Sequence, residues 1–333
     1  HCGAVTAAAE EGHVNGGHLG GLLAAIRPAV ERARELGRDV VEAAARINAA
    51  LVAEQLRGSE PVLSWLVEQG RLRVVSAFYK LETGQVEFRE THSALDEYLA
   101  SREADYCPQR HMVGCTWSGP GYHTRVADGT WVHATRDNLD YALALLAAGG
   151  WEREGRARAV IEAVVGLQDT DPTQPTYGIW PWLLEEPLEQ MSPPDWNWAD
   201  FCGARLAQVL ADHDDQLTAE LRARVRAALG HAAWSIFRRN VGPDYTNIAV
   251  MGAGVSLAAG ELLGEGRLLD YGRARLQRVE EHTRATGGFA EYNSPTYTMV
   301  ALHECERILQ LVGDEDSRTV AERLRGAIWE SIA

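Results

Sequence analysis

Residues 296–312 run TYTMVALHECERILQLV, and apolar side chains recur along this stretch at intervals of three and four residues. This spacing is typical of an amphipathic α-helix, because positions three and four apart lie on the same helical face. The same pattern extends over most of the second half of the chain. It predicts further helices at residues 136–149, 153–168, 199–212, 216–238, 246–263, 267–285 and 316–332. A mainly α-helical fold is therefore expected.

Short connections separate these predicted helices, which favours antiparallel pairing of neighbours into helical hairpins. A curved array of such hairpins can form an (α/α) toroid, and we expect residues 107–333 to form part of one, truncated at its C-terminus. The exception is residues 169–198, which are rich in proline and tryptophan. A connection of about thirty residues is longer than a compact helical domain needs to join two helices, so it is a candidate functional loop.

The first part of the chain shows a different pattern. Two amphipathic helices are predicted within residues 19–57, and a shorter helix is predicted within residues 60–70. The hydrophobic period then changes to two, which predicts a hairpin of strands formed by residues 72–79 and 85–88. We expect an incomplete α/β segment here.

The boundary between the two parts is expected in residues 93–106, which are polar and suit a linker or a connecting helix. Residues 1–92 and 107–333 are then separate segments. Within the second, residues 121–135 predict a hairpin whose strands flank a turn at Asp128 and Gly129.

Composition and charge exclude some functions. The formal net charge is −15, and a nucleic-acid partner requires a basic face, so such a partner is not expected. No apolar run reaches the roughly 18 residues of a membrane helix, so no membrane partner is expected either. Five cysteines at irregular spacing fit a reducing compartment. A cytoplasmic location is the default expectation, with an upstream leader left open because the chain does not begin with methionine.

The segment His1-Cys2-Gly3-Ala4-Val5 resembles the second zinc motif of β-type carbonic anhydrases. The resemblance continues to about residue 90. It is carried by residues 16–28, Asn48, residues 54–57, residues 59–63 and residues 70–88. In that family a zinc ion, held by two cysteines and one histidine, activates water to hydrate carbon dioxide. The resemblance implies a zinc-dependent ancestry and makes a homodimer through this segment a candidate assembly.

Only Cys2 can be carried over as a zinc ligand. His1 stands next to Cys2, at a variable position of the motif, and the other ligands of the family would lie upstream of the chain. His13 and His18 fit a solvated loop better than a metal site. Zinc is therefore expected only if the missing upstream segment is present, and the anhydrase activity is expected to be lost.

The candidate functional loop and its surroundings combine aromatic and acidic side chains. Sugar rings stack on indole rings, while their hydroxyl groups need acidic or amide partners, so this composition suits a glycan cleft. The candidate substrate-binding residues are Tyr177, Trp180, Trp182, Asp195, Trp196, Trp198, Asp200 and Arg238. The bland interpretation is an aromatic loop that packs over one end of the helical array.

Arg239, Asn247 and the later segment Gly288–Tyr297 resemble the helical toroid of heparinase II/III and alginate-lyase type enzymes. In those enzymes an asparagine begins one helix, and a Gly-x-x-Glu-x-x-Ser-Pro-x-Tyr element begins a later one. The resemblance carries over to Asn247 and Tyr297, both at predicted helix starts. This chain departs from the pattern at Thr298, where the family usually has histidine, and in lacking the β-sandwich that usually follows the toroid.

The resemblance implies β-elimination on a uronate glycan, a polysaccharide or an oligosaccharide. Asn247, aided by Arg238 or Arg239, would neutralise the carboxylate, and Tyr297 would move protons, with Tyr245 and Tyr292 as second choices. Lowering of the tyrosine pKa by neighbouring cations would assist that role.

Two alternatives stay open. One is glycoside hydrolysis on the same scaffold, with Glu291 paired with Asp195 or Asp200. The other is a non-catalytic or vestigial fusion, in which Asn247 and Ser294 only cap helices. His111, His123 and His133 are further acid or base candidates, and Cys107 with Cys115 gives a weak metal signal.

We expect this polypeptide neither to bind zinc stoichiometrically nor to hydrate carbon dioxide, because Cys2 alone supplies too few ligands. Metal analysis of the purified protein checks this. One tightly held zinc ion per chain would contradict it.

Overall fold

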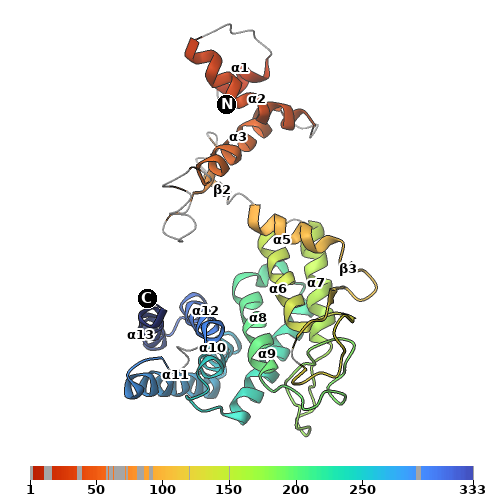
Figure 1. Cartoon of the computed structure of the whole chain (residues 1–333), viewed down its shortest axis with the longest axis vertical. Coiled ribbons are helices and arrows are strands. Elements are labelled where there is room, and N and C mark those ends of the chain that lie inside the picture. Colours follow the sequence, from red (N-terminus) through yellow and green to blue (C-terminus); the bar gives the residue numbers. More distant parts are fainter. Residues whose placement is uncertain are drawn as a thin grey trace. The chain divides into compact units, whose positions relative to one another are not determined.

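The structure is a computed structural model of the whole chain. It describes residues 3–10, 17–35, 40–57, 59, 63, 72, 74–80, 86–89, 93–119, 121–149, 151–289 and 294–332. The chain divides into two compact units, His1–Glu97 and Tyr98–Ala333, each described here by itself. The fold is mainly α-helical, with a few short strands (Figure 1).

Unit 1 contains helices α1 (Gly3–Ala9), α2 (Gly17–Glu35) and α3 (Val40–Arg57), followed by strands β1 (Ser76–Tyr79) and β2 (Val86–Arg89). Its described core is apolar and joins Val5 of α1, Ile26 and Val30 of α2, and Ala44 of α3. Strands β1 and β2 pair antiparallel, with Ser76 opposite Arg89. The two helices and the hairpin predicted from the sequence are thus confirmed, while the predicted helix within residues 60–70 lies outside the described residues.

Unit 2 begins in α5 (Ser93–Glu103), so part of the predicted linker is a connecting helix. Two small antiparallel pairs follow, β3 (Tyr106–Cys107) with β4 (Met112–Val113) and β5 (Cys115–Thr116) with β6 (Trp131–Val132). The remaining helices are α6 (Thr135–Ala148), α7 (Trp151–Val165), α8 (Trp198–Asp212), α9 (Ala219–Arg239), α10 (Thr246–Leu263), α11 (Gly266–Thr286), α12 (Pro295–Leu311) and α13 (Glu315–Ile332), with the short 3-10 helix η1 (Asp214–Gln216) between α8 and α9. They match the predicted helices to within a few residues.

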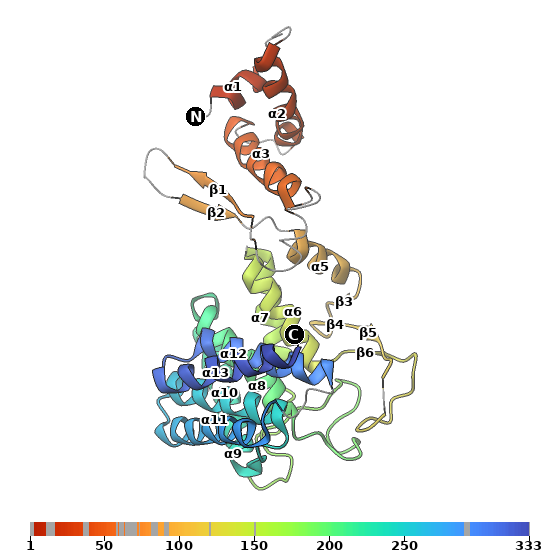
Figure 2. The same cartoon turned by 60° about the vertical axis from the view of Figure 1, so that its left-hand side comes forward.

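The helices of unit 2 form hairpins arranged in two rows. Consecutive helices pair as α6 with α7, α8 with α9, α10 with α11, and α12 with α13. In one row α6, α8, α10 and α12 contact one another in order, and in the other α7, α9, α11 and α13 do the same. Figure 2 shows the last two hairpins stacked against each other. We call the first row the inner row.

Helix α10 is the core helix of this unit. Contrary to the expectation that no apolar run reaches such a length, it is long and apolar enough to cross a membrane by length and composition, yet 78% of it is buried inside the fold. Its contact with α11 depends on glycine, since a Cβ added at Gly260 would lie 2.6 Å from the backbone nitrogen of Leu269. The lack of a side chain at Gly260 therefore lets the two backbones approach closely.

The prediction of a hairpin within residues 121–135 was wrong about which strands pair. The turn at Asp128 and Gly129 forms, but β6 pairs with β5, not with the segment around His123. That segment is held by a different partner, because the backbone N–H of Arg125 donates to Glu186 Oε1 and the N–H of Ser192 donates to the His123 carbonyl. Contacts distant in sequence therefore outweigh the local hairpin.

The long connection at residues 169–197 contains no helix or strand, as predicted, and is anchored on the helical array. Trp180 is fully buried, and its Nε1–H donates to the carbonyl oxygen of Val164 in α7. The backbone N–H of Thr135, at the start of α6, donates to the carbonyl of Trp182 at 2.9 Å. These anchors fix the loop against the starts of the inner-row helices.

Gly260→Ala should lower the free energy of unfolding by about 1–3 kcal/mol, because the new Cβ overlaps the backbone of α11. The matched control is Gly326→Ala in α13, where a Cβ meets nothing within 4 Å; that change should raise stability by about 0.5–1 kcal/mol. Urea unfolding followed by circular dichroism measures both. A Gly260→Ala protein as stable as the parent would contradict the close packing of α10 on α11.

Candidate functional site

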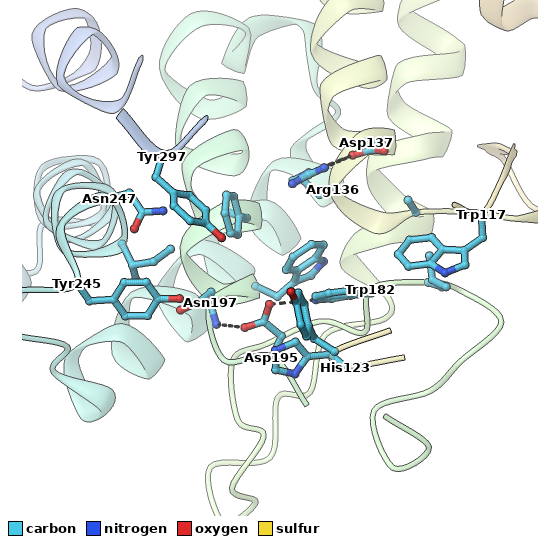
Figure 3. A pocket seen from close by; sticks show the side chains of 16 residues that line it. Trp117, His123, Arg136, Asp137, Trp182, Asp195, Asn197, Tyr245, Asn247 and Tyr297 are labelled. Carbon is cyan, nitrogen blue, oxygen red and sulfur yellow. Dashed lines mark hydrogen bonds and ion pairs between the residues drawn. The ribbon is translucent and has the colours of Figure 1, made fainter. Parts of the chain in front are cut away.

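A cavity of about 390 Å³ lies where the inner-row helices begin (Figure 3). Each of α6, α8, α10 and α12 contributes residues from its first turn or from the residue before it. The long loop and the segment before β6 complete the wall. The lining residues are Trp117, Tyr122, His123, Ala134, Arg136, Asp137, Trp182, Leu183, Asp195, Asn197, Trp198, Phe201, Tyr245, Asn247, Ile248 and Tyr297.

The electrostatic character of the cavity follows from this position. The N-terminus of a helix carries a partial positive charge and unpaired N–H groups, so a site where several helices begin favours an anion. Arg136, in the first turn of α6, adds a full positive charge and stands 5.5 Å from the ring centres of both Trp198 and Phe201. Asp137 pairs with Arg136 at 3.0 Å and lies at the same rim.

The aromatic wall is held rigidly by its indole N–H groups. Trp182 donates to Asp195 Oδ2 at 3.1 Å, and Trp198 donates to Thr135 Oγ1 at 2.8 Å. The ring centres of Trp182 and Trp198 are 5.0 Å apart, and Trp117 continues the series at 6.0 Å from Trp182. The three indoles therefore form one aromatic cluster in the cavity wall, and the ring surface that it leaves open can pack against a ring-shaped ligand.

Asn247 and Tyr297, taken from the lyase resemblance, line the same cavity (Figure 3). Asn247 is 2% exposed, and its Oδ1 has no hydrogen-bond partner among the described residues. Tyr297 is 53% exposed and lies in the first turn of α12, whose start is capped by Ser294 Oγ accepting from the Tyr297 N–H. The predicted capping role of Ser294 is therefore present beside the cavity. Within the described residues no cation contacts the Tyr297 ring.

Tyr245 and Arg239 meet at Asn197, a residue that sequence reasoning missed. Asn197 Nδ2 donates to the Tyr245 hydroxyl oxygen at 3.1 Å, and Arg239 donates to Asn197 Oδ1. The backbone N–H of Asn197 also donates to Asp195 Oδ1 at 3.0 Å. Arg239 thus acts on the cavity through Asn197 and does not line it.

His123 packs against Trp182 and is held by the carbonyl group of Pro193. Its Nδ1 lies 2.7 Å from the carbonyl oxygen of Pro193, and its ring meets Trp182 edge-on at 5.2 Å. The other two predicted histidines lie elsewhere. His133 pairs through Nδ1 with Glu185 Oε1 at 2.6 Å, and His111 is an exposed turn residue with φ of 53°.

Several predicted substrate-binding residues lie outside the cavity. Trp180 belongs to the core, because its side chain is fully buried. Tyr177 is buried and its hydroxyl pairs with His231 Nδ1 at 2.9 Å, while Arg238 stacks over the Tyr177 ring and donates to the Pro172 carbonyl. Trp196 donates to the Pro175 carbonyl at 2.8 Å. These side chains stabilise the loop itself, so they are unavailable to a substrate in this cavity.

Glu291, Tyr292 and Cys2 lie outside the described residues. In the part of the chain that the structure describes, no group of three or more His, Cys, Asp and Glu side chains is arranged to hold a metal ion. The ligand set of an anhydrase zinc is therefore not offered by these residues. Cys107 is engaged with Gln109, at 3.4 Å between Sγ and Oε1.

The polar, charged and aromatic lining residues that the sequence did not single out are Trp117, Tyr122, Arg136, Asp137, Asn197 and Phe201. Most of them sit within one turn of a predicted helix start, as Asn247 and Tyr297 do. Their proximity to the predicted starts of alternate helices was therefore a sequence signal that could have identified Arg136 and Phe201. Trp117 and Tyr122 carried no such signal, because their positions depend on the pairing of β5 with β6.

Asp200 lies behind the cavity and does not line it. It is 2% exposed, and its Oδ1 has no hydrogen-bond partner among the described residues. Burial raises the pKa of Asp200 to about 7, and the positive charges of Arg275 and Arg239 partly offset that effect. Gly252 makes room for this arrangement, since a Cβ there would lie 2.5 Å from Asp200 Oδ1 and 2.8 Å from Arg275 Nη2.

Two family models match separate parts of the chain. A family model described as "Domain of unknown function (DUF8769)" matches residues 117–333, and a model described as "Carbonic anhydrase" matches residues 1–86. The N-terminal segment is therefore carbonic-anhydrase-like. No curated protein and no solved structure matches the chain.

Asp200→Asn should make the fold more stable than the parent at pH 8. The folded chain holds the Asp200 proton more tightly than the unfolded chain, so protonation stabilises the fold below about pH 4 and this contribution is lost as the pH rises through about 7. The free energy of unfolding of Asp200→Asn should therefore exceed that of the parent by a margin that grows between about pH 4 and about pH 7, by at most about 1.4 kcal/mol per pH unit. Unfolding measured across this range tests it, with Asp215→Asn, an exposed site, as the control. A stability difference that does not change with pH would contradict the assignment.

Proposed function

We propose that this chain, which belongs to the family described as "Domain of unknown function (DUF8769)", binds an acidic glycan at the start of the inner-row helices and cleaves it by β-elimination. The single observation that carries the proposal is the convergence of four helix N-termini, Arg136 and Asn247 on one aromatic-lined cavity. The C-terminal unit is the enzyme in this proposal.

The charge of the cavity supports an anionic substrate. The chain as a whole carries a formal charge of −15, so it repels polyanions at long range. Binding of a uronate therefore needs a local positive potential, for which the four helix N-termini are the main source, because Arg136 is paired with Asp137 and Asp195 adds a second carboxylate. Asp137 lies at the same cavity as a hydrogen-bond partner for sugar hydroxyl groups.

The aromatic wall supports a sugar. The C–H faces of a pyranose ring pack against indole rings, and Trp182 and Trp198 present a surface whose rings are fixed by Asp195 and Thr135. A cavity of about 390 Å³ is within the range of known small-ligand sites. A short segment of a glycan is the ligand that fits both the wall and the volume.

Asn247 supports the chemistry of elimination. A carboxylate that accepts hydrogen bonds from an amide makes the neighbouring C–H group more acidic, because the charge that develops on removing its proton is stabilised. The Asn247 amide lies at the cavity, and Arg136, in place of the predicted Arg238 and Arg239, is the cation that lines the same cavity. A base then removes the proton, the electron pair forms a carbon–carbon double bond, and an acid protonates the leaving oxygen.

Hydrolysis is supported less well. It requires two carboxyl groups on either side of the glycosidic bond. Of the predicted carboxylates, Asp195 lines the cavity, Asp200 is buried behind it, and Glu291 lies outside the described residues. Asp195 also accepts hydrogen bonds from Trp182 and from the backbone of Asn197, so it already has a structural role.

Supplying a panel of uronate polymers should produce ultraviolet absorbance from the new double bond. Reducing sugar without this absorbance would indicate hydrolysis instead. If a folded, helical protein gave neither product with any polymer of the panel, this would contradict catalysis on these glycans and favour a binding or vestigial module.

The double variant Asn247→Ala, Tyr297→Phe should reduce the elimination rate by about 100-fold or more without unfolding the chain, because it removes the group that stabilises the developing charge and a cavity hydroxyl. Tyr79→Phe is the matched control, since Tyr79 is comparably exposed and belongs to unit 1. Turnover retained in the double variant would refute these roles.

A further inference from the structure

The geometry points to His123 as the proton acceptor of this cavity and Tyr245 as its proton donor, with both roles fixed by hydrogen bonds to neighbouring groups. This inference deepens the proposed function and rests on it. Sequence reasoning named Tyr297 first as the residue that moves protons, and the hydrogen bonds around the cavity select a different pair.

The acceptor role of His123 follows from the Pro193 carbonyl. A carbonyl oxygen can only accept a hydrogen bond, so at 2.7 Å from this oxygen the His123 Nδ1 must carry the hydrogen. In the neutral ring the lone pair is then on Nε2. The backbone of His123 is held by the same loop, since the Ser192 N–H donates to the His123 carbonyl at 3.2 Å. The ring is thus oriented as well as limited to one tautomer.

Nε2 of His123 is left for a ligand. His123 lines the cavity beside Trp182, and among the described residues no group donates a hydrogen bond to Nε2. A neutral imidazole that lines a ligand cavity, with one nitrogen donating to a fixed oxygen and the other without a protein partner, has the arrangement of a general base.

The donor role of Tyr245 follows from Arg239. A guanidinium group only donates hydrogen bonds, so the atom of the Asn197 amide that faces Arg239 must be its oxygen. The amide nitrogen therefore faces Tyr245 and donates to the hydroxyl oxygen at 3.1 Å. Because that oxygen accepts from Asn197, the Tyr245 hydrogen is directed elsewhere, and Tyr245 is an exposed residue of the cavity wall. It is available to a leaving oxygen.

These two side chains are joined by one line of contacts. Figure 3 shows Tyr245, Asn197, Asp195 and His123 in sequence along the edge of the cavity. Tyr245 contacts Asn197, the Asn197 backbone contacts Asp195, and Asp195 holds Trp182, against which His123 packs. By contrast, no described residue forms a hydrogen bond with the Tyr297 hydroxyl, so nothing there fixes the direction of its hydrogen.

The resulting step balances in protons and electrons. His123 Nε2 takes the proton from the carbon next to the carboxylate, that C–H electron pair becomes the second bond of the double bond, and the carbon–oxygen bond to the leaving sugar breaks. The leaving oxygen takes the hydrogen of Tyr245. His123 is then a cation and Tyr245 a phenolate, and a proton passes from one to the other through solvent before the next turnover.

Asn197→Asp tests the donor role with little change in shape. A carboxylate can still pair with Arg239, but it can only accept from Tyr245, so it captures the hydroxyl hydrogen that the leaving oxygen needs. Turnover of the uronate polymer should fall by about 100-fold. Binding of a uronate oligosaccharide, followed by tryptophan fluorescence, should weaken because of the added negative charge, but by less than turnover falls.

Tyr245→Phe should show the same pattern, with turnover reduced more than binding. Asn48→Asp in α3 of unit 1 is the matched control and should leave both measurements unchanged. Turnover at the parent rate in either Asn197→Asp or Tyr245→Phe would overturn the donor role.

The acceptor role has a readout that does not depend on activity. In the protein with 15N-labelled histidine, the His123 ring signal, assigned by its loss in His123→Gln, should report hydrogen on Nδ1 and none on Nε2 in the neutral form of the ring. The opposite tautomer would overturn the acceptor role even in an active enzyme. Failure of the parent chain to cleave any uronate polymer would instead contradict the proposed function, and the tautomer would still decide how His123 is held.

Discussion

The shared direction of the inner-row helices is the constraint on which the site depends. Helices α6, α8, α10 and α12 contact one another in order, and the first turn of each reaches the same cavity. This arrangement requires α10 to lie buried between its neighbours, which its apolar sequence and the close approach at Gly260 permit. A site assembled in this way takes its side chains from residues up to 180 positions apart, from Trp117 to Tyr297.

Hydrogen bonds from buried or fixed groups then set the orientation of these side chains. Arg275 is buried and donates to the carbonyl oxygens of Ile248 and Ala249, so it supports the turn of α10 that carries Asn247. Thr135 and Asp195 hold the two central indoles. The cavity is thus supported by a second set of polar contacts, which is what a site for precise chemistry needs.

The two segments differ in the chemical groups that their described residues offer. Residues 1–86 match the carbonic anhydrase family, yet the described residues offer no metal-ligand group, and Cys2 lies outside them. Residues 117–333 match a family without an assigned function, yet they form a polar and aromatic cavity. The match to the carbonic anhydrase family is therefore not accompanied by a metal-ligand group among the described residues.

The sequence by itself determined the helices, the hairpin of β1 and β2, and the long loop, because each depends on local periodicity or on proline and glycine content. It also placed Asn247 and Tyr297 at helix starts. Only the tertiary structure decided that Trp180 is a core residue while Trp182 lines the cavity, since two neighbouring indoles in one loop differ only in which surface they meet. Likewise, the roles of His123 and Asn197 depend on Pro193 and Arg239, partners 70 and 42 residues away, and no local pattern specifies such contacts.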